Sequence, residues 1–560
     1  MFRLIRSRPK TPDLAAGPGF RWPIACLILS MFASAATAQN ATAMSSALSS
    51  GNAANSTGAI GSAGSLPSLG DNSELAAAAE RRIGDRIAAS IYRDPDYIDD
   101  PVLWDYIQSI WKPLMDAARA RGELNDELQE RFAWELFLIR DRTVNAFALP
   151  GGFFGIHLGL VSVVSNRDEL AAVLGHELSH VTQRHISRLL TQQTRQAPWV
   201  IGAMILGALA ASKNPQAASA AIVGGQAVAA QSQLDFSRDM EREADRVGFG
   251  VMTDAGFESR GVATMFEKLQ QASRLNDNGS FPYLRSHPLN TQRIAEAQSR
   301  YQLAAKPMPA AGTAAALASE KARFLHAMMA ARAKVLVEPG VDVLRAMTAE
   351  AQRLLNVAAA ASKPSSASDF NAAGTLYAGA FAAARMRDFG LAQTLATRLK
   401  AMSAGNPEAA RAVDLLELEL ALLAGTVTAQ TPAPQMTPTS SRAEVLIKSR
   451  ALLAIGRAPE VSERLQTWVS AHPKDSTAWQ LLAVAYGNQG QSVRAVRAEA
   501  ESRFAQLDYT GALDRFRAAQ GIIRANPAGA DFVEASIIDT RARQVDSLVK
   551  EQALQDKVDR

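Results

Sequence analysis

The chain has 560 residues, which is too long for one hydrophobic core, so two to four domains are expected. The hydrophobic fraction of 48% and the charged fraction of 20% are ordinary for a globular protein. The formal net charge of +4 is carried by the first 38 residues, where five basic side chains stand against one acidic side chain. The rest of the chain is nearly neutral, which argues against nucleic acid or another strongly anionic partner.

Residues 1–38 have the three parts of a secretory signal peptide. A basic start precedes an apolar run at residues 23–35, and the small-residue triplet at residues 36–38 follows it. The apolar run is too short to span a bilayer, so we predict cleavage after Ala38; a membrane anchor is the alternative. The only cysteine, Cys26, lies in this run and fits a lipidation signal poorly. An exported chain without disulfides is expected in a bacterial periplasm.

The next segments differ sharply in composition. Residues 39–72 are rich in Ala, Ser, Gly and Asn and are predicted to be a flexible linker. Residues 73–305 are predicted to form one mostly helical domain. Within it, a Pro-Gly-Gly turn separates two apolar runs at residues 145–164, a pattern typical of a β-hairpin. Two amphipathic helices are predicted at residues 167–190 and 231–256.

The C-terminal half is predicted to be helical. Residues 306–425 form an Ala-rich, helical repeat-like region, and residues 426–442 a Pro/Thr-rich linker or loop. Residues 443–560 contain a degenerate repeat pattern with W-x-x-L-[GA]-x-x-Y spacing, made by Trp479, Leu482, Ala483 and Tyr486. We therefore predict tetratricopeptide-like repeats there, with a generic helical bundle as the alternative.

The clearest chemical signal is an H-E-x-x-H pattern at His176, Glu177 and His180. Residues four positions apart on a helix differ by about 40° in direction, so both imidazoles project from one face and can share a zinc ion. Glu177 can reach a metal-bound water and take its proton during attack on a peptide carbonyl. The pattern predicts one zinc ion per chain with Glu177 as general base; a chance match on a surface helix is the alternative.

A catalytic zinc needs a third protein ligand. His185 would face away from His176 on one continuous helix, so it is predicted to be a core histidine or a partner of a ligand. On the later helix, Glu241 and Asp245 share a face, and Glu243 points away from it. Glu241 is the predicted third ligand, and Asp245 is placed to orient a ligand histidine. A purely structural zinc is disfavoured, because such sites commonly use cysteines.

H-E-x-x-H with a later E-x-x-x-D resembles the gluzincin peptidases. Together, the segments NAFALPGG, LAAVLGHELSHVTQRH, SRDMEREADRVG and RSHPLNTQRI resemble the HtpX/Ste24-related zinc metallopeptidases. The resemblance covers residues 74–303 strongly and the C-terminal half only in architecture. It implies a mainly α fold, in which a zincin-type metallopeptidase domain with a small β-hairpin or sheet precedes an α-helical repeat domain. It also implies that His176, His180 and Glu241 bind zinc and that Glu177 is the base.

The resemblance implies further site residues. Residues 145–152 match a family segment that forms a strand at the edge of the cleft, where it can pair with an extended peptide. Asn145, Ala146 and Phe147 are the substrate-binding residues that this match implies. His287 matches an S-H-P motif and could either fill the fourth zinc position, silencing the site, or donate to the oxyanion. A histidine in the loop before a helix is the alternative. Arg293 is a weaker candidate for contact with the cleft.

The implied function is a periplasmic zinc endopeptidase in the quality control and assembly of outer-membrane proteins. Its substrates would be unfolded or misassembled proteins, and the assembly machinery is a candidate partner of the repeats. The alternative is a chaperone or assembly adaptor that works through the repeats while the protease site is latent. Membrane integration is not implied. For the apolar residues 198–212, peripheral contact with a membrane and a cover over the active site both remain open.

Overall fold

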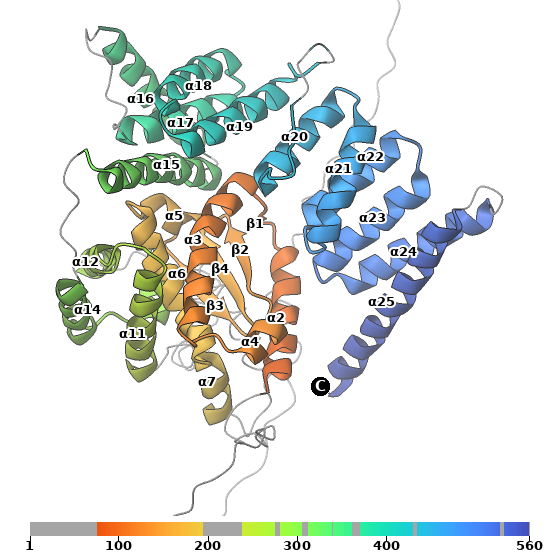
Figure 1. Ribbon diagram of the computed structural model, residues 1–560, viewed down its shortest axis with the longest axis horizontal. Coiled ribbons are helices and arrows are strands. Elements are labelled where there is room, and N and C mark those ends of the chain that lie inside the picture. Colours follow the sequence, from red (N-terminus) through yellow and green to blue (C-terminus); the bar gives the residue numbers. More distant parts are fainter. Residues whose placement is uncertain are drawn as a thin grey trace, which may run out of the picture. The chain divides into compact units, whose positions relative to one another are not determined.

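The computed structural model describes residues 76–193, 238–274, 280–304, 312–338, 340–360, 370–428, 430, 434–526 and 531–558 (Figure 1). The signal peptide predicted at residues 1–38, the linker at residues 39–72 and the apolar residues 198–212 lie outside these ranges. The predicted domain boundaries stay predictions. Among the described helices, none is long and apolar enough to cross a membrane.

A four-stranded sheet lies in the N-terminal part of the described chain (Figure 1). In spatial order its strands are β1 (Tyr97–Ile98), β2 (Glu135–Ile139), β4 (Phe153–His157) and β3 (Ala146–Leu149). β2 and β4 run parallel, whereas β1 pairs with β2, and β3 with β4, in antiparallel fashion. β3 therefore forms one edge of the sheet, and β4 is buried along its whole length.

The predicted β-hairpin is confirmed by the β3–β4 pair, in which Ala146 faces Ile156 and Leu149 faces Phe153. The prediction is wrong beyond His157, where the chain turns into helix α5 (Leu158–Val163). Strands β1 and β2 were not predicted from the sequence. β2 is a short buried apolar run, and periodicity alone does not separate such a strand from a buried helix.

Helix α6 (Arg167–Thr182) is central to this part of the chain, because it packs against β3 and against several helices. Among those helices are α3 (Pro101–Ala120), α11 (Arg238–Asp254) and α12 (Arg260–Arg274). The Asn166 side chain caps α6 by accepting hydrogen bonds from two backbone N–H groups of its first turn. The other helices here are α2 (Ala77–Tyr92), α4 (Asp126–Arg131), α7 (His185–Gln193), α13 (Tyr283–Ser286) and α14 (Thr291–Ala304).

The single helix predicted at residues 167–190 is two helices in the structure. α6 ends at Thr182, and α7 begins at His185. Arg184, between them, has a φ of 55°, in the left-handed region that breaks a right-handed helix. The break changes the direction in which His185 projects, so its predicted position on the far face of one helix is wrong.

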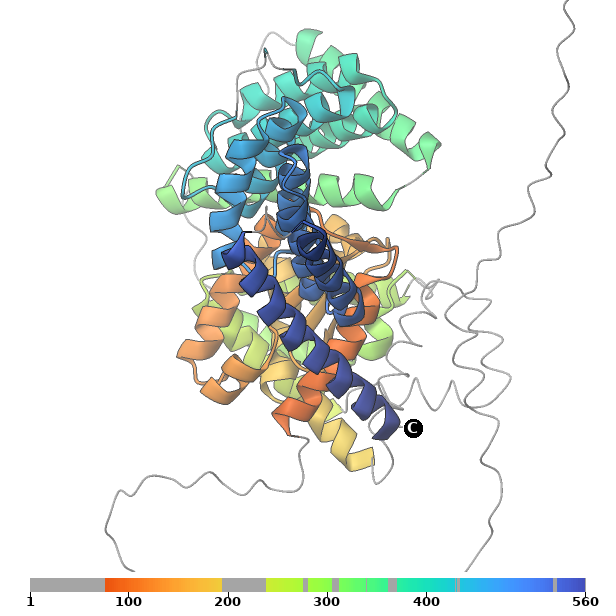
Figure 2. The same ribbon diagram turned by 90° about the vertical axis from the view of Figure 1, so that its right-hand side faces the viewer.

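The described residues of the C-terminal part form helices joined by turns and loops, with no strand among them (Figures 1 and 2). Its helices are α15 (Ala314–Val337), α16 (Val341–Ala360), α17 (Phe370–Arg385), α18 (Phe389–Ser403), α19 (Pro407–Ala424), α20 (Arg442–Ala454), α21 (Ala458–Ala471), α22 (Ser476–Asn488), α23 (Ser492–Ala505), α24 (Tyr509–Ala525) and α25 (Phe532–Val558). From α20 onward, each helix packs against the next. The four side chains of the predicted repeat pattern are all buried on α22. Their assignment to a tetratricopeptide repeat stays a prediction.

Two adjacent aspartates before α3 bind arginines of the C-terminal helices. Arg332 on α15 donates to both Asp100 carboxylate oxygens and, through its other side, to Glu419. Arg442 on α20 donates to Asp99 at 2.7 Å and to Asp475 at 2.8 Å. We call these two arginines and their carboxylate partners the aspartate junction. It fixes the C-terminal helices to the start of α3.

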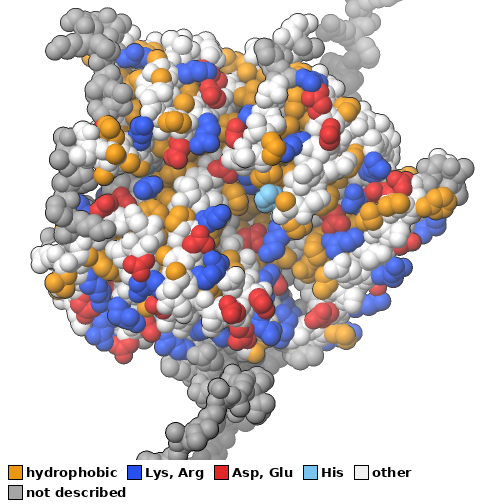
Figure 3. Space-filling view, in the orientation of Figure 1, with side chains coloured by type: hydrophobic (Ala, Val, Ile, Leu, Met, Phe, Trp, Pro, Cys, Tyr) orange, Lys and Arg blue, Asp and Glu red, His pale blue; other side chains and the backbone are white. Residues whose placement is uncertain are grey.

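Charged side chains on the face shown in Figure 3 are interspersed, with red and blue groups side by side. This mixture agrees with the near-neutral charge of the chain after residue 38. The visible face therefore offers no large surface of one sign.

Candidate metal centre

Helix α6 presents His176 and His180 one turn apart. Their Nε2 atoms are 3.0 Å from each other, and both side chains are buried. The two imidazoles thus project from one face of α6, the arrangement that lets two histidines share a metal ion.

Glu241 reaches these histidines from α11. Its Oε1 lies 3.4 Å from His180 Nε2, and its Oε2 lies 3.5 Å from His176 Nε2. The close approach of the two helices depends on Gly175 and Gly248, because a Cβ atom on Gly248 would lie only 2.9 Å from the Gly175 carbonyl oxygen. The pair of glycines therefore brings the carboxylate within reach of the histidines.

His287, the C-cap residue of α13, is the fourth member of the cluster. Its Nδ1 lies 3.0 Å from Glu241 Oε1 and 3.3 Å from His176 Nε2. The ligand atoms of His176, His180, Glu241 and His287 all lie within 4.8 Å of one another, and all four residues are buried. The loop after α13 therefore delivers His287 into the cluster.

Asp245 and Arg293 support the histidine–carboxylate cluster from behind. Asp245 Oδ1 lies 3.0 Å from His176 Nδ1, and Arg293 donates two hydrogen bonds to Asp245, at 2.6 and 2.8 Å. Arg293 Nη1 also pairs with Glu241 Oε2 at 2.8 Å. Arg293 was only a weaker candidate for contact with the cleft, and in the structure it is a buried bridge between two carboxylates.

The pKa values of these groups follow from burial opposed by charge. Burial raises the pKa of Asp245, but hydrogen bonds from Arg293 and His176 outweigh it and lower that pKa to about 2. Burial lowers the pKa of His176, but hydrogen bonds to Asp245 and Glu241 overcome it and raise that pKa to about 10. Asp245 is therefore ionised at neutral pH and holds the Nδ1 proton of His176.

Glu177 differs from the other carboxylates of the cluster. Both of its oxygens are buried, and neither has a partner in good hydrogen-bond geometry within the described part of the chain, although the Tyr283 hydroxyl stands near enough to lower the pKa of this carboxyl. The His287 Nε2 atom lies 3.4 Å from Glu177 Oε1. Burial raises the pKa of Glu177, against the lowering effects of His287 and His176.

A zinc ion fits this donor set. Two imidazole nitrogens and one carboxylate oxygen are a known ligand combination of catalytic zinc sites, which keep an open position for water. The two Glu177 oxygens without hydrogen bonds are complementary to such a water, which could donate to them. His176, His180 and Glu241 would hold the ion, with His287 within reach of the same position.

His185 lies beside the cluster, against the prediction that it would face away. Its Nδ1 is 2.8 Å from His180 Nδ1, and its Nε2 is 3.1 Å from Glu243 Oε2. Burial lowers the pKa of His185 to about 4, despite the raising effect of Glu243. The alternative that His185 partners a ligand therefore matches its position.

The predicted substrate-binding residues lie at or next to the edge strand β3. Asn145 is buried, and its Oδ1 accepts no hydrogen bond among the described residues. Ala146 is also buried, whereas Phe147 is half-buried and lies edge-on to His157. β3 packs against α6, so the edge strand runs beside the helix that carries the histidines. A role of these residues in binding peptide stays a prediction.

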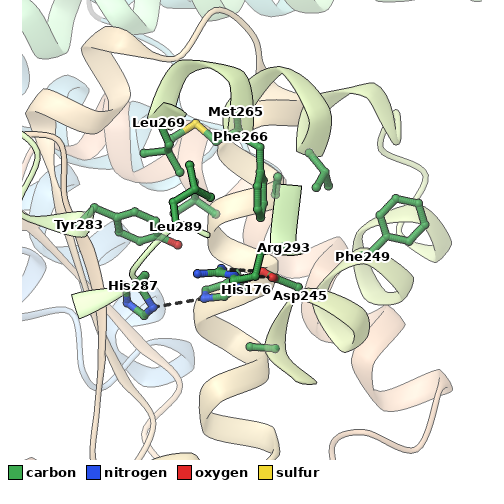
Figure 4. A pocket seen from close by; sticks show the side chains of 15 residues that line it. His176, Asp245, Phe249, Met265, Phe266, Leu269, Tyr283, His287, Leu289 and Arg293 are labelled. Carbon is green, nitrogen blue, oxygen red and sulfur yellow. Dashed lines mark hydrogen bonds and ion pairs between the residues drawn. The ribbon is translucent and has the colours of Figure 1, made fainter. Parts of the chain in front are cut away.

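A pocket opens beside the histidines, between α6, α11 and α12 (Figure 4). Tyr283 and His287 lie on one side of it, with their rings stacked at a centroid distance of 4.6 Å. Most of the remaining lining is apolar, including Val262, Met265, Phe266, Leu269 and Leu289. Tyr283 was not singled out from the sequence, because a lone tyrosine carries no recognisable spacing.

Comparison with known proteins identifies the surrounding domain. Residues 105–301 match peptidase family M48. The chain is 34% identical over 228 residues to the putative beta-barrel assembly-enhancing protease of Vibrio cholerae, covering 41% of this chain and 45% of that one. It is 34% identical over 232 residues to the beta-barrel assembly-enhancing protease of Escherichia coli, with the same two coverages. It is also 31% identical over 196 residues to the mitochondrial metalloendopeptidase OMA1 of Arabidopsis thaliana, covering 35% of this chain and 36% of that one. The chain spans less than half the length of these curated relatives.

Proposed function

Because residues 105–301 form a peptidase family M48 domain, we propose that the chain is a zinc-dependent endopeptidase that hydrolyses peptide bonds. One observation carries the proposal. The buried Glu177 carboxylate accepts no hydrogen bond within the described residues, and it stands beside two histidines and a glutamate that fit one zinc ion. Such a carboxylate costs stability unless a ligand supplies the missing donor.

The side chains of the centre would divide the work. When bound, a zinc ion supplies Lewis-acid polarisation of the substrate carbonyl and a lowered water pKa. Glu177 would take the proton of the attacking water and later donate it to the leaving amine, and burial raises its pKa, which makes it a better proton acceptor. Asp245 and Arg293 keep His176 and Glu241 in place throughout.

His287 has two possible tasks at this site. Its position within reach of the ligand atoms supports a fourth ligand that silences the centre, and its Nε2 beside Glu177 supports a donor to the oxyanion. The variant His287→Ala separates them. Faster cleavage than wild type indicates a silencing ligand, whereas slower cleavage at full zinc loading indicates a donor.

We propose that substrates are unfolded or misassembled proteins, bound in extended form along β3 through Asn145, Ala146 and Phe147. The position of β3 at the sheet edge and its packing against α6 support this, because an edge strand can add a further strand. The names of the bacterial relatives support a role in assembly and quality control of outer-membrane proteins. We place that role in the periplasm, after removal of residues 1–38, with the predicted repeats recruiting the assembly machinery.

Cleavage of unfolded casein tests the proposed activity. Wild-type chain loaded with one zinc ion should cleave casein, chelation should abolish cleavage, and added zinc should restore it. A zinc-loaded chain that leaves casein and other unfolded proteins intact would contradict the proposal.

An assembly adaptor is the second candidate function, favoured by the long succession of packed helices from α20 to α25. Complementation of a deletion strain distinguishes the two functions. Rescue by Glu177→Gln but not by a chain truncated at Thr426 would favour the adaptor. The reverse pattern would favour the peptidase.

A further inference from the structure

The two histidines of the centre are held by different partners. His176 has the Asp245 carboxylate directly on its Nδ1, at 3.0 Å. His180 has another imidazole there, because His185 Nδ1 lies 2.8 Å from His180 Nδ1. The other nitrogen of the His185 ring, Nε2, lies 3.1 Å from the Glu243 carboxylate. We call His185 and Glu243 the relay pair.

Metal binding fixes where the protons of this chain of rings must lie. His180 turns its Nε2 toward the ligand cluster, so that nitrogen must carry the lone pair and Nδ1 must carry the proton. His180 Nδ1–H therefore donates to His185 Nδ1, which must be unprotonated. The remaining proton of His185 sits on Nε2 and donates to Glu243 Oε2.

The opposite proton order is incompatible with the centre. If His185 donated to His180 Nδ1, the proton of a neutral His180 would lie on Nε2, the nitrogen that faces His176 and Glu241. Arg188 strengthens the favourable order, because its Nη2 donates to the same Glu243 oxygen at 2.7 Å and keeps that carboxylate ionised.

The relay pair is positioned by the break between α6 and α7. Arg184, in its left-handed conformation, donates to the buried Glu80 of α2 at 2.9 Å. The buried salt bridge holds the chain in the turn after which His185 can fold back onto His180. On a continuous helix, His185 would project to the opposite side.

We propose that His185 and Glu243 are positioning residues that fix the tautomer and orientation of His180 and thereby strengthen zinc binding at the centre. This inference rests on the proposed zinc site but not on peptidase activity. Partners that orient a ligand histidine typically contribute about 10–100-fold to metal affinity.

Zinc affinity of the full metal-free chain, measured by competition with a fluorescent chelator, tests the inference. His185→Leu removes both contacts and should weaken zinc binding by about 10–100-fold. His185→Asn restores an acceptor oxygen near the Nδ1 position and should recover part of the affinity. Glu243→Gln alters a partly exposed side chain, so the fold is kept, and it should weaken zinc binding less than His185→Leu.

His326→Gln is the matched control. His326 is also buried, but it lies between the Tyr106 hydroxyl and the Val164 carbonyl, away from the centre. Its replacement should lower the melting temperature without changing the zinc affinity. Equal zinc affinity in wild type and His185→Leu overturns the inference, and so does a loss in His326→Gln as large as that in His185→Leu. A wild type that binds no zinc overturns both the inference and the proposed function.

Discussion

The protein buries two clusters of charged side chains, and they differ in how their oxygens are satisfied. In the aspartate junction, Arg332 donates to Asp100 and Glu419 at 2.7–2.9 Å, and Arg442 does the same for Asp99 and Asp475. In the metal centre, Glu177 is just as deeply buried, yet neither of its oxygens accepts a hydrogen bond among the described residues.

The difference separates a structural cluster from a functional one. A buried ion pair is expensive to break but is complete in itself, so it needs no ligand. A buried carboxylate without hydrogen-bond donors lowers the folding stability, and evolution tolerates that cost where the group has a function. Removing a carboxylate charge should therefore lower the folding stability in the aspartate junction and raise it at Glu177 in the metal centre.

The largest effect is expected from removing a ligand. Glu241→Ala leaves two histidines to hold the ion, so zinc affinity should fall by more than the about 100-fold upper range for outer partners of a ligand. Bound zinc after dialysis, measured by mass spectrometry, checks this. Retention of one zinc ion per chain by Glu241→Ala would show that the ligand set is wrong.

Substitution in the aspartate junction should lower the folding stability and leave the zinc affinity unchanged. Arg332→Met leaves the buried Asp100 and the partly buried Glu419 without their cation, which should cost about 3–5 kcal/mol of folding free energy. Denaturant titration measures the loss, and zinc affinity serves as the control that should not change. A loss below about 1 kcal/mol, the value typical of exposed pairs, would mean that the junction is effectively solvated.

The close contact between α6 and α11 should affect both the folding stability and the zinc affinity. Gly248→Ala forces a methyl group against the Gly175 carbonyl, so α6 and α11 must move apart at a cost of about 1–3 kcal/mol. Because Glu241 lies on α11, this movement takes its carboxylate away from the histidines of α6, and zinc affinity should fall as well. Gly487→Ala, in a position with open space around the added methyl group, is the control and should leave zinc binding unchanged. Unaltered stability and affinity in Gly248→Ala would contradict the close-approach argument.

The smallest effect is expected when one carboxylate of each cluster is replaced by its isosteric amide. Asp100→Asn should lower the melting temperature of the zinc-free protein, because it removes a charge that Arg332 needs. Glu177→Gln should raise it, because burial raises the pKa of Glu177 and its ionised form costs stability above the ordinary pKa of 4.5. The gap between Glu177→Gln and wild type should therefore widen as the pH rises from 4.5. Melting curves across pH measure it; a constant or reversed gap would contradict the argument.

The local parts of the site could be read from the sequence. His176 and His180 are four residues apart, and so are Glu241 and Asp245, so helix periodicity alone places each pair on one face of its helix. The β3–β4 hairpin was also predictable, because its two strands are adjacent in the sequence and are joined by a short local turn.

The parts that depend on distant residues could not. The break before His185 is held by Glu80, 104 residues before Arg184, and no local pattern announces it. The pairing of β2 with β4 and the bridge that Arg293 makes to Asp245, 48 residues away, are likewise set by tertiary packing. The contacts of Arg184 and Arg293 adjust residues that the sequence had indicated, His185 and Asp245, whereas β2 was missed altogether.

The cleavage rate of zinc-loaded Glu177→Gln tests the central claim most directly. The substitution leaves His176, His180 and Glu241 in place, so one zinc ion per chain should still bind. Casein cleavage should fall by about 10²–10⁴-fold, the usual contribution of a general base. A zinc-loaded Glu177→Gln chain that cuts casein as fast as wild type would contradict the assignment of this buried carboxylate as the base.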